Sequence, residues 1–570
     1  MTTPTAEGTV PWPEETAARY RQEGLWRDLP LHAVLMESAK GREDKVALVD
    51  GDVRITFGEL VDRVEAAAAR LLDIGLRPDD RIVLQLPNSW QFAVLTLACF
   101  RAGIVPVMAL PGHRLHEMRA VAEVAEARAV AVPERIKDFD HRRLAQQVAE
   151  EVASVEMIMI SGTAQADEVS LDDLLRPSAS EDSPKEKAGG IPQPDPDLVL
   201  MFLLSGGTTG MPKLIARTHN DYDYNIRECS RVSGLSEDTV YLVALPAGHN
   251  FPLGCPGLLG ALFAGGTVVM LSSPHPVKAL QTIQNEGVTV TAAVPAVAQR
   301  WIDYVEETAD LPDISSLKVL QVGGSRFPDE LAARVRPVLG CTLQQVFGMA
   351  EGLINMTRLD DPEEVITTTQ GRPVSSADDI RIVDPLGQDL PDGQPGSILT
   401  RGPYTPRGYY RAPEANERSF VEGWYSSGDI VERRPDGNLV VHGRDKDIIN
   451  RGGEKISAEE VESLVYRLSA IEMAAAVAMP DPSLGEGLCL YVKLREGENI
   501  TLEQVRTELT DAGLAPFKLP ERLEIIDEIP MTRVGKINKK ALREDVRRRM
   551  EPSSTSQTNY DREGERDGHP

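Results

Sequence analysis

Residues 198–213 read Leu-Val-Leu-Met-Phe-Leu-Leu-Ser-Gly-Gly-Thr-Thr-Gly-Met-Pro-Lys, an apolar run that passes directly into a loop of glycine and threonine. The run over 198–204 is typical of a buried strand. In the loop, glycine permits positive φ and lets backbone N–H groups approach an anion, while hydroxyl groups add donors. We therefore interpret the loop as a phosphate site, against the alternative of an ordinary exposed turn. Its candidate phosphate-binding residues are Ser205, Gly206, Gly207, Thr208, Thr209, Gly210 and Lys213.

The spacing of this loop differs from the Walker A motif of P-loop kinases and GTPases. In that motif the lysine directly follows the last glycine, and a serine or threonine follows the lysine. Here Met211 and Pro212 precede Lys213, and Leu214 follows it. The sequence therefore indicates a phosphate loop of another class.

The composition of the chain narrows the classes of partner and compartment. A length of 570 residues predicts about two to four domains, and a formal charge of −27 argues against nucleic acid as the main partner. The five cysteines are scattered without metal-binding spacing, and no signal peptide is apparent. No apolar stretch reaches the roughly 18 residues that a membrane span needs. We expect a cytoplasmic protein with reduced thiols that binds neither nucleic acid nor membrane.

Helical and strand patterns alternate from Leu31 onward. Residues 45–49, 81–86 and 104–108 read as strands, and helices are expected to begin at Thr56 and Ser89 between them. Strand, helix and strand at this spacing predict βαβ units and a largely parallel sheet. Further strands are expected at 198–204, 266–271, 288–294 and 317–322.

The pattern changes to short strands and turns from Ser397, which predicts a β-rich subdomain. The predicted fold class is therefore α/β, with a large N-terminal domain of parallel-rich sheets, this β-rich subdomain and a small α+β C-terminal domain. Residues 162–196 mix proline with charged residues, as an exposed linker or insertion would. The expected parts are a lead-in over 1–30 that packs through Trp12 and Trp26, a large domain over 31–443, a small domain over 444–549 and a disordered tail over 550–570.

Two further segments carry carboxylates in positions suited to a nucleotide. Asp429 ends Trp-Tyr-Ser-Ser-Gly-Asp, and its carboxylate could accept hydrogen bonds from both ribose hydroxyls. An ordinary Asx turn is the alternative. Glu351 ends Gln-Val-Phe-Gly-Met-Ala-Glu and is an oxygen ligand suited to Mg²⁺, which binds one or two carboxylates together with phosphate. A glutamate that merely stabilises the start of a helix is the alternative.

The order of these motifs resembles the adenylate-forming superfamily, whose signature loop is similar to residues 205–213. Within this resemblance, Gly323-Gly-Ser325 and Val346-Phe-Gly348 are similar to the adenine-binding turns, and Ser427-Gly-Asp429 to the ribose motif. Five motifs in order are far more specific than any one of them. The resemblance implies ATP and Mg²⁺ as cofactors. The residues it adds are Gly324, Val346, Phe347, Gly348 and Arg444 for ATP, Lys446 as the hinge between domains, and Lys536, in Pro530-Met-Thr-Arg-Val-Gly-Lys536, as the catalytic lysine.

A closer resemblance lies in Ala247-Gly-His-Asn-Phe-Pro-Leu-Gly-Cys-Pro-Gly257, which is similar to the stand-alone aryl-acid AMP ligases. It implies that Asn250 bonds the ortho hydroxyl of the acid and that Phe251 packs on the ring. His249 would stand near the entry of the acid and is counted with Lys536 among the catalytic residues. Plain core roles for His249 and Phe251 are the alternative. The substrate-binding residues are then His249, Asn250, Phe251, Cys255, Gly324, Ala350 and Ile354.

The substituents of the ring are suggested by Cys255 and Ile354. Enzymes for 2,3-dihydroxybenzoate resemble this run but carry serine where Cys255 stands, whereas salicylate enzymes tend to carry cysteine. A thiol is a weak donor and behaves as a small apolar group, so a salicylate-like 2-hydroxybenzoate is favoured. Ile354 is bulkier than the valine expected for dihydroxybenzoate. The alternatives 2,3-dihydroxybenzoate, 3-hydroxyanthranilate, 3-hydroxypicolinate and 6-methylsalicylate remain open.

The resemblance also implies the reaction and its acceptor. The carboxylate of the acid would attack the α-phosphate of ATP, and the small domain would then turn at Lys446 to bring Gly452, Gly453 and Lys455 to a pantetheine thiol. No carrier motif of the Leu-Gly-Gly-x-Ser type occurs in the chain, so the acceptor would be a separate aryl carrier protein of siderophore or antibiotic biosynthesis, or coenzyme A. An aryl-CoA ligase is thus one alternative. A non-catalytic nucleotide-binding protein is another.

Overall fold

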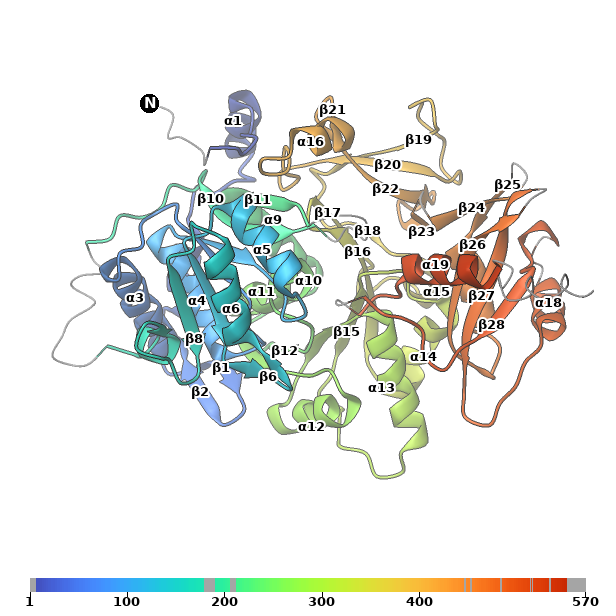
Figure 1. The fold of residues 1–570 in the computed structure, drawn as a ribbon, viewed down its shortest axis with the longest axis horizontal. Coiled ribbons are helices and arrows are strands. Elements are labelled where there is room, and N and C mark those ends of the chain that lie inside the picture. The colour runs from blue at the N-terminus through green and yellow to red at the C-terminus, as the bar shows by residue number, and fades with distance from the viewer. Residues whose placement is uncertain are drawn as a thin grey trace, which may run out of the picture. The chain divides into compact units, whose positions relative to one another are not determined.

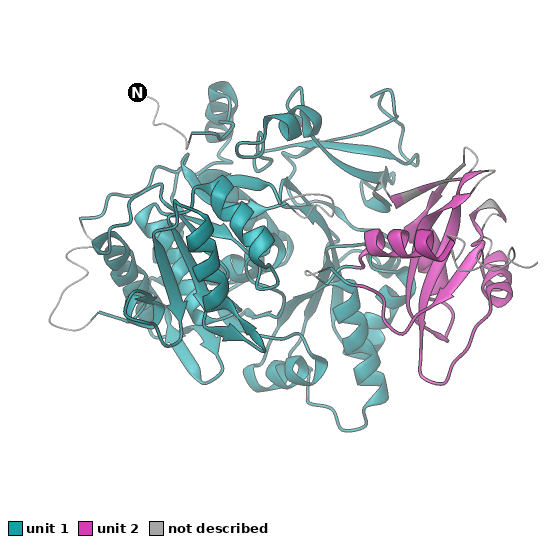
Figure 2. Cartoon of the chain, in the orientation of Figure 1, with its two compact units in different colours: residues 1–446, 531–536 teal, residues 447–530, 537–570 magenta. Residues whose placement is uncertain are grey.

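The computed structural model describes residues 7–178, 190–205, 212–444, 447–451, 454–481, 484–512, 514, 516–532 and 535–550. The chain forms two compact units (Figure 2). The first unit comprises residues 1–446 with 531–536, and the second comprises 447–530 with 537–570. No helix in the described part is long and apolar enough to cross a membrane.

The first unit contains a seven-stranded sheet whose edge strand follows the glycine and threonine loop and whose next strand precedes it (Figure 1). Neighbouring strands of this sheet are parallel except for β10 (Val199–Leu204) and β11 (Leu214–Thr218), which are antiparallel. Helices α4 (Trp90–Ala102), α5 (Leu115–Ala125) and α6 (His141–Glu151) pack against it. In spatial order the strands are β11 (Leu214–Thr218), β10 (Val199–Leu204), β4 (Val105–Met108), β3 (Arg81–Leu84), β5 (Ala129–Pro133), β8 (Met157–Ser161) and β9 (Val169–Ser170).

A nine-stranded sheet forms the other α/β layer of the first unit. Its middle strands are parallel, and antiparallel strands close both edges. Its strands in order are β18 (Arg372–Pro373), β17 (Gly352–Met356), β16 (Thr342–Met349), β15 (Val319–Gly323), β14 (Val290–Ala293), β12 (Val240–Val243), β13 (Thr267–Met270), β1 (Val46–Asp50) and β2 (Val53–Thr56). The helices of this part are α3 (Phe57–Asp73), α9 (His219–Val232), α10 (Asn250–Gly254), α11 (Gly257–Phe263), α12 (Pro276–Glu286), α13 (Pro295–Glu307), α14 (Asp329–Leu339) and α15 (Glu363–Thr368).

The β-rich subdomain of the first unit is an antiparallel sheet with a small apolar core. Leu353, Ile398 and Val431 are fully buried in that core, and Phe347 packs against it. This contact brings the aromatic residue of the predicted adenine surface next to the core around Val431, on the strand that also carries Asp429. The elements are β19 (Asp379–Val383), β20 (Gly396–Arg401), α16 (Pro413–Ser419), β21 (Phe420–Val421), β22 (Trp424–Arg433) and β23 (Leu439–Arg444).

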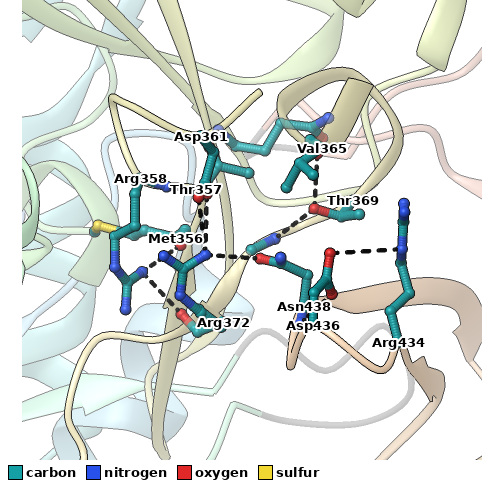
Figure 3. Close-up of polar contacts among 12 residues, drawn as sticks. Met356, Thr357, Arg358, Asp361, Val365, Thr369, Arg372, Arg434, Asp436 and Asn438 are labelled. Carbon is teal, nitrogen blue, oxygen red and sulfur yellow. Dashed lines mark hydrogen bonds and ion pairs between the residues drawn. The ribbon is translucent and has the colours of Figure 1, made fainter. Parts of the chain in front are cut away.

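A polar cluster fixes this subdomain to the edge of the nine-stranded sheet (Figure 3). Arg372 donates to both carboxylate oxygens of Asp361, at 3.0 and 3.1 Å, and to Asn438 Oδ1 at 3.4 Å. Beside it, Leu439 N donates to the carbonyl of Gly371 at 2.8 Å. Gly371 has φ +76°, and a Cβ built there would lie 2.0 Å from the carbonyl carbon of Met356. Only glycine therefore allows the backbone to pass so close to the sheet.

The second unit is a smaller α+β body. Its five-stranded sheet is antiparallel except where β28 (Arg522–Ile525) joins β27 (Gly485–Leu494) in parallel. The predicted α/β fold, with parallel-rich sheets, a β-rich subdomain and a small α+β part, is confirmed. The elements of this unit are β24 (Ile448–Arg451), β25 (Glu454–Ser457), α17 (Ala458–Val465), β26 (Ile471–Asp481), β27 (Gly485–Leu494), α18 (Leu502–Asp511), β28 (Arg522–Ile525) and α19 (Lys539–Met550).

The predicted lead-in and insertion are both partly packed. Trp26 is buried and donates from Nε1 to the carbonyl of Pro403 at 3.0 Å. Within the range 162–196, β9 extends the seven-stranded sheet, and α7 (Leu171–Leu174) contributes the buried Leu171 and Leu174. Residues 179–189 of that range and 551–570 of the expected tail lie outside the described residues, and the domain boundaries stay predictions. The remaining elements are α1 (Glu14–Gln22), α2 (Leu31–Ala39), β6 (Arg135–Ile136) and β7 (Phe139–Asp140).

Candidate functional site

The loop that the sequence assigns to phosphate joins the antiparallel strands β10 and β11. Ser205 N donates to the carbonyl of Lys213 at 2.9 Å, and Lys213 N donates to Ser205 Oγ at 3.0 Å. These bonds close the base of the loop as a hairpin. Its tip lies outside the described residues, so the structure does not place Gly206, Gly207, Thr208, Thr209 and Gly210.

Tyr409 contacts both Lys213 and Glu351. The ammonium group of Lys213 lies 5.1 Å from the centroid of the Tyr409 ring, which is a cation–π contact. The Tyr409 hydroxyl donates to Glu351 Oε1 at 2.9 Å. The proposed triphosphate lysine and the proposed magnesium ligand are thus neighbours. An isolated bridge between Ile215 and Tyr409 holds the tyrosine beside the start of β11.

Glu351 has the chemistry that a magnesium ligand requires. Its side chain is largely buried, and it presents carboxylate oxygens, one of which accepts from Tyr409. Among the described residues, no three His, Cys, Asp or Glu side chains gather as a protein-only metal site would require. A single carboxylate fits Mg²⁺, which takes most of its remaining ligands from water and substrate phosphate.

Asp429 lies on β22, within electrostatic reach of Tyr425, whose hydroxyl lies 3.3 Å from that of Tyr409. Its backbone N–H donates to Ser427 Oγ at 3.1 Å, and its Cα pairs with that of Arg444 across β22 and β23. Burial raises the pKa of Tyr425, and the charges of Glu351 and Asp429 raise it further. The charges of the proposed ribose acceptor and the proposed metal ligand therefore act on the same phenol. The side chain of Arg444 lies outside the described part of the chain.

The predicted adenine surface follows from the pairing of β15 with β16. Gly323 ends β15 and pairs with Val346, and Gly324 then turns with φ +92°. Val346 is buried and Gly348 is exposed. A Cβ on Gly348 would lie 2.5 Å from Ile354 Cδ1, so the exposed glycine lies directly over the buried Ile354.

The acid-binding candidates begin at the N-terminus of α10. His249 caps this helix, because its Nδ1 accepts from the backbone N–H of Phe251 at 3.3 Å. A Cβ on Gly323 would lie 3.2 Å from Cε1 of Phe251, so the aromatic ring lies against the glycine turn. A Cβ on Gly324 would lie 3.4 Å from Lys536 Cε. The Phe251 ring, the turn at Gly323 and Gly324, and the Lys536 side chain are therefore adjacent.

The charge of Lys536 also affects His249. Burial, and then this ammonium group, lower the pKa of His249 to about 4. The imidazole is consequently neutral at neutral pH and retains Nδ1 as an acceptor. His249 is thus suited to cap the helix and to offer an N–H from its other nitrogen, and less suited to hold a permanent positive charge.

Asn250 lies in a buried polar chain. Tyr222 donates from its hydroxyl to Asn250 Oδ1 at 2.9 Å, and Asn250 Nδ2 donates to Cys255 Sγ at 3.3 Å. Asn225, one turn after Tyr222 on α9, donates to the carbonyl of Gly254 at 2.7 Å. The amide predicted to read the ortho substituent is therefore held by neighbours on both sides.

Arg217 connects this chain to Ala350. Its guanidinium carbon lies 4.7 Å from the centroid of the Tyr222 ring, and its Nη1 donates to the carbonyl of Ala350 at 3.1 Å. Asp221 neutralises it at 2.7 Å, and both side chains are at most 1% exposed. The buried Arg217 therefore contacts both Tyr222, which bonds Asn250, and the backbone of Ala350, next to Glu351.

Sequence reasoning missed Tyr222, Tyr409 and Arg217. None of them belongs to a local motif, and each acts through a residue far away in the chain, such as Asn250 or Glu351. The only sequence signal for any of them was the opposite charges of Arg217 and Asp221, which stand four positions apart as in a helix.

Of the other candidates, Lys446, Gly452 and Gly453 lie outside the described residues. Lys455 lies on β25 of the second unit, and its side chain also falls outside them.

Comparisons with known proteins agree on one family. The profile described as AMP-binding enzyme matches residues 35–410, and that of the AMP-binding enzyme C-terminal domain matches residues 460–536. The chain is 55% identical, over 95% of its length and 98% of the other protein, to a salicylyl-CoA synthase / salicylate adenylyltransferase from a Streptomyces species. It is 44% identical to the salicyl-AMP ligase / salicyl-S-ArCP synthetase of Mycobacterium tuberculosis, with 94% of each chain covered. The solved apo structure of Mycobacterium smegmatis MbtA matches with a TM-score of 0.71 at 44% identity, covering 94% of this chain and 98% of that one.

Proposed function

Because the chain belongs to the AMP-binding enzyme family, we propose that it activates an aryl acid with ATP and passes the acyl group to a thiol. The favoured acid is a 2-hydroxybenzoate such as salicylate. The favoured acceptor is the phosphopantetheine thiol of a separate aryl carrier protein. Two of the relatives, from Streptomyces and Mycobacterium tuberculosis, act on salicylate by their names, and both names include an adenylyltransferase or AMP ligase activity.

The observation that carries the proposal is the meeting of Phe251, Gly323–Gly324 and Lys536. In the first half reaction a carboxylate oxygen of the acid forms a bond to the α-phosphorus of ATP, and the bond from that phosphorus to pyrophosphate breaks. Negative charge grows on the phosphate oxygens, so a preorganised cation stabilises the transition state. We assign this role to Lys536. Phe251 holds the ring of the acid, and Asn250 bonds its ortho hydroxyl.

The nucleotide is assigned to the residues around Tyr409. Lys213 and the loop from Ser205 hold the triphosphate, and Asp429 accepts from the ribose hydroxyls. The adenine packs against the surface of Val346, Phe347 and Gly348. Mg²⁺ at Glu351 would neutralise phosphate charge when bound. Lys213 and Glu351, which both contact Tyr409, would then hold the phosphate and the metal ion of one complex.

The second half reaction is proposed from the family resemblance. The thiol sulfur attacks the carbonyl carbon of the acyl adenylate, and AMP leaves. We assign Arg444 to ATP binding, Lys446 to the hinge, and Gly452, Gly453 and Lys455 to the passage of the thiol.

Isotope exchange between pyrophosphate and ATP tests the first half reaction. The acids to compare are benzoate, salicylate, 2,3-dihydroxybenzoate, 3-hydroxyanthranilate, 3-hydroxypicolinate and 6-methylsalicylate. Salicylate is expected to give the highest kcat/KM. Exchange with none of these acids would contradict the proposal and favour a nucleotide-binding protein without this activity.

Coenzyme A is the second candidate acceptor, because one relative is named a salicylyl-CoA synthase. The test supplies the adenylating enzyme with either coenzyme A or a carrier protein that bears phosphopantetheine. Formation of the carrier thioester at the higher kcat/KM supports the carrier. A faster reaction with coenzyme A would reclassify the chain as an aryl-CoA ligase.

A further inference from the structure

The amide of Asn250 is held at both of its ends. Its Oδ1 accepts from the hydroxyl of Tyr222 at 2.9 Å, and its Nδ2 donates to Cys255 Sγ at 3.3 Å. All three residues are buried. Asn250 therefore cannot reorient without breaking a buried hydrogen bond.

The orientation of the Asn250 amide follows from which of its neighbours must donate a hydrogen. Burial raises the pKa of Tyr222 well above its usual value, so the phenol keeps its single hydrogen. That hydrogen needs an acceptor, and Asn250 Oδ1 supplies one. A flipped amide would instead point an N–H of Asn250 at Tyr222 and would leave the phenolic hydrogen without this partner.

The hydroxyl of Tyr222 also has little space to move. A Cβ on Gly254 would lie 2.4 Å from Tyr222 Oη, so a side chain there would overlap the hydroxyl. The guanidinium carbon of Arg217 also lies 4.7 Å from the centroid of the Tyr222 ring. Arg217 is itself held by Asp221, whose Oδ1 lies 2.7 Å from Arg217 Nε. The donor that faces Asn250 is thus fixed by packing as well as by its hydrogen bond.

We propose that Tyr222 is a positioning residue that orients Asn250 with an N–H toward the acid, so that the site selects an ortho substituent able to accept a hydrogen bond. This inference rests on the proposed aryl-acid activity and on the place of Asn250 in the acid site. One Nδ2 hydrogen of Asn250 is directed to Cys255, and the second is the polar hydrogen that remains for the substrate.

The chemistry of the ortho group then sets the preference. In salicylate the hydroxyl donates its hydrogen to the neighbouring carboxylate, and its oxygen keeps a lone pair that can accept from Asn250. In anthranilate the amine also donates one hydrogen to the carboxylate, but a second N–H remains and its lone pair is delocalised into the ring. The amine would therefore meet the N–H of Asn250 as a second donor. The site is therefore expected to select an acid with an ortho hydroxyl over one with an ortho amine.

Replacement of Tyr222 by phenylalanine tests this role, because Tyr222→Phe keeps the ring and removes only the hydroxyl. The kcat/KM for pyrophosphate exchange is measured with salicylate, anthranilate and benzoate. The preference for salicylate over each of the other acids is expected to fall about fivefold, which is the size of one neutral hydrogen bond. An equal loss for all three acids would mean a structural role only and would overturn the inference, as would an unchanged preference.

Two further variants separate this role from general damage. Gly254→Ala places a methyl group against the Tyr222 hydroxyl and is expected to reduce the same preference. Tyr224→Phe is the matched control, because its hydroxyl bonds Ser375 Oγ at 2.7 Å and not Asn250, and it should leave the preference within about twofold. A comparable change in Tyr224→Phe would overturn the inference. Wild-type exchange with none of the acids would instead contradict the proposed function.

Discussion

Lys536 is the residue on which the proposed chemistry depends most directly. Its side chain lies next to Gly324, and its charge helps to keep His249 neutral. Lys536→Ala removes the cation that is proposed to stabilise the charge on the phosphate oxygens, so pyrophosphate exchange should fall by at least about a hundredfold. Nucleotide binding should persist, because the loop of Lys213 and the carboxylate of Asp429 are unchanged. Exchange rates and nucleotide titrations measure the two effects separately.

The control for this prediction is Lys540→Ala. Lys540 is an exposed lysine on α19 whose ammonium group lies 4.0 Å from Glu544. Because exposed pairs of this kind contribute little, exchange should remain close to wild type. Normal exchange in Lys536→Ala would reject the catalytic role.

Cys255 provides a prediction about the substituent at the meta position. Its sulfur accepts a hydrogen bond from Asn250, and its S–H group is only a weak hydrogen-bond donor. Cys255→Ser introduces a hydroxyl of similar size that can bond a meta hydroxyl, so kcat/KM for 2,3-dihydroxybenzoate relative to salicylate should rise about tenfold. The paired assay with both acids is its own control for folding. An unchanged ratio would remove the argument from Cys255 to salicylate.

The candidate site divides into residues that sequence could predict and residues that it could not. Asn250, Phe251 and Cys255 lie within one short segment, so a local resemblance was enough to single them out. Tyr222 and Tyr409 were missed because their contacts join distant parts of the chain. Tyr222 is 28 positions from Asn250, and Tyr409 is 58 positions from Glu351. Such contacts depend on tertiary packing, which no short motif encodes.

At the scale of elements, the start of α9 depends on a buried ion pair. Asp221 accepts from Arg217 at 2.7 Å and from Thr218 N at 2.6 Å, and Thr218 Oγ1 completes the cap of the helix. Asp221→Asn removes the negative charge and leaves the buried Arg217 uncompensated. The free energy of unfolding of the first unit should therefore fall by roughly 3–5 kcal/mol.

The sequence provides a suitable probe and a control for this measurement. The tryptophans at 12, 26, 90, 301 and 424 all belong to the first unit, so urea unfolding followed by tryptophan fluorescence reports on that unit. Glu151→Gln breaks the exposed pair of Arg119 with Glu151, at 3.1 Å, and should change stability by less than about 0.5 kcal/mol. Similar small losses in both variants would contradict the importance of the buried pair.

The elements themselves were largely predictable where capping and periodicity agree. Thr56 caps α3 by accepting from Glu59 N at 3.2 Å, and Ser89 caps α4, both at the predicted helix starts. The range 162–196 was harder, because its prolines and charges obscure the short apolar segment around Leu171. A helix as short as α7 is stabilised by tertiary contacts and not by its own propensity. Local sequence therefore gave too little signal for it.

At the scale of the whole molecule, buried histidines make the first unit sensitive to acid. Burial lowers the pKa of His32 on α2 to about 4, with a further contribution from the charge of Arg101. Burial lowers the pKa of His219 at the start of α9 to about 3, with a further contribution from His32. Both imidazoles are therefore neutral in the folded protein at pH values where an unfolded chain, with pKa about 6.5, already binds protons.

The sign of the pH dependence follows from this difference. Above about pH 7.5 these histidines are almost entirely neutral in both states, and their contribution to stability is complete. As pH falls from 6.5 toward 4, the unfolded state binds more protons than the folded state, so stability decreases. The pair can contribute up to about 2.7 kcal/mol per pH unit in this window. Below it, the folded protein also begins to bind protons and the slope declines.

Unfolding by urea at closely spaced pH values, followed by tryptophan fluorescence, measures this slope for the first unit. His219→Asn removes one of the buried histidines, so the decrease between pH 6.5 and 4 should become shallower by up to about 1.4 kcal/mol per pH unit, whatever the variant costs at neutral pH. His116→Asn replaces an exposed histidine of the same unit and is the matched control. An equal slope in His219→Asn and the wild type would show that other groups cause the acid sensitivity. A shallower slope in His219→Asn alone would locate it at the contact of α2 with α9, where Leu31 N donates to His219 Nδ1 at 3.1 Å.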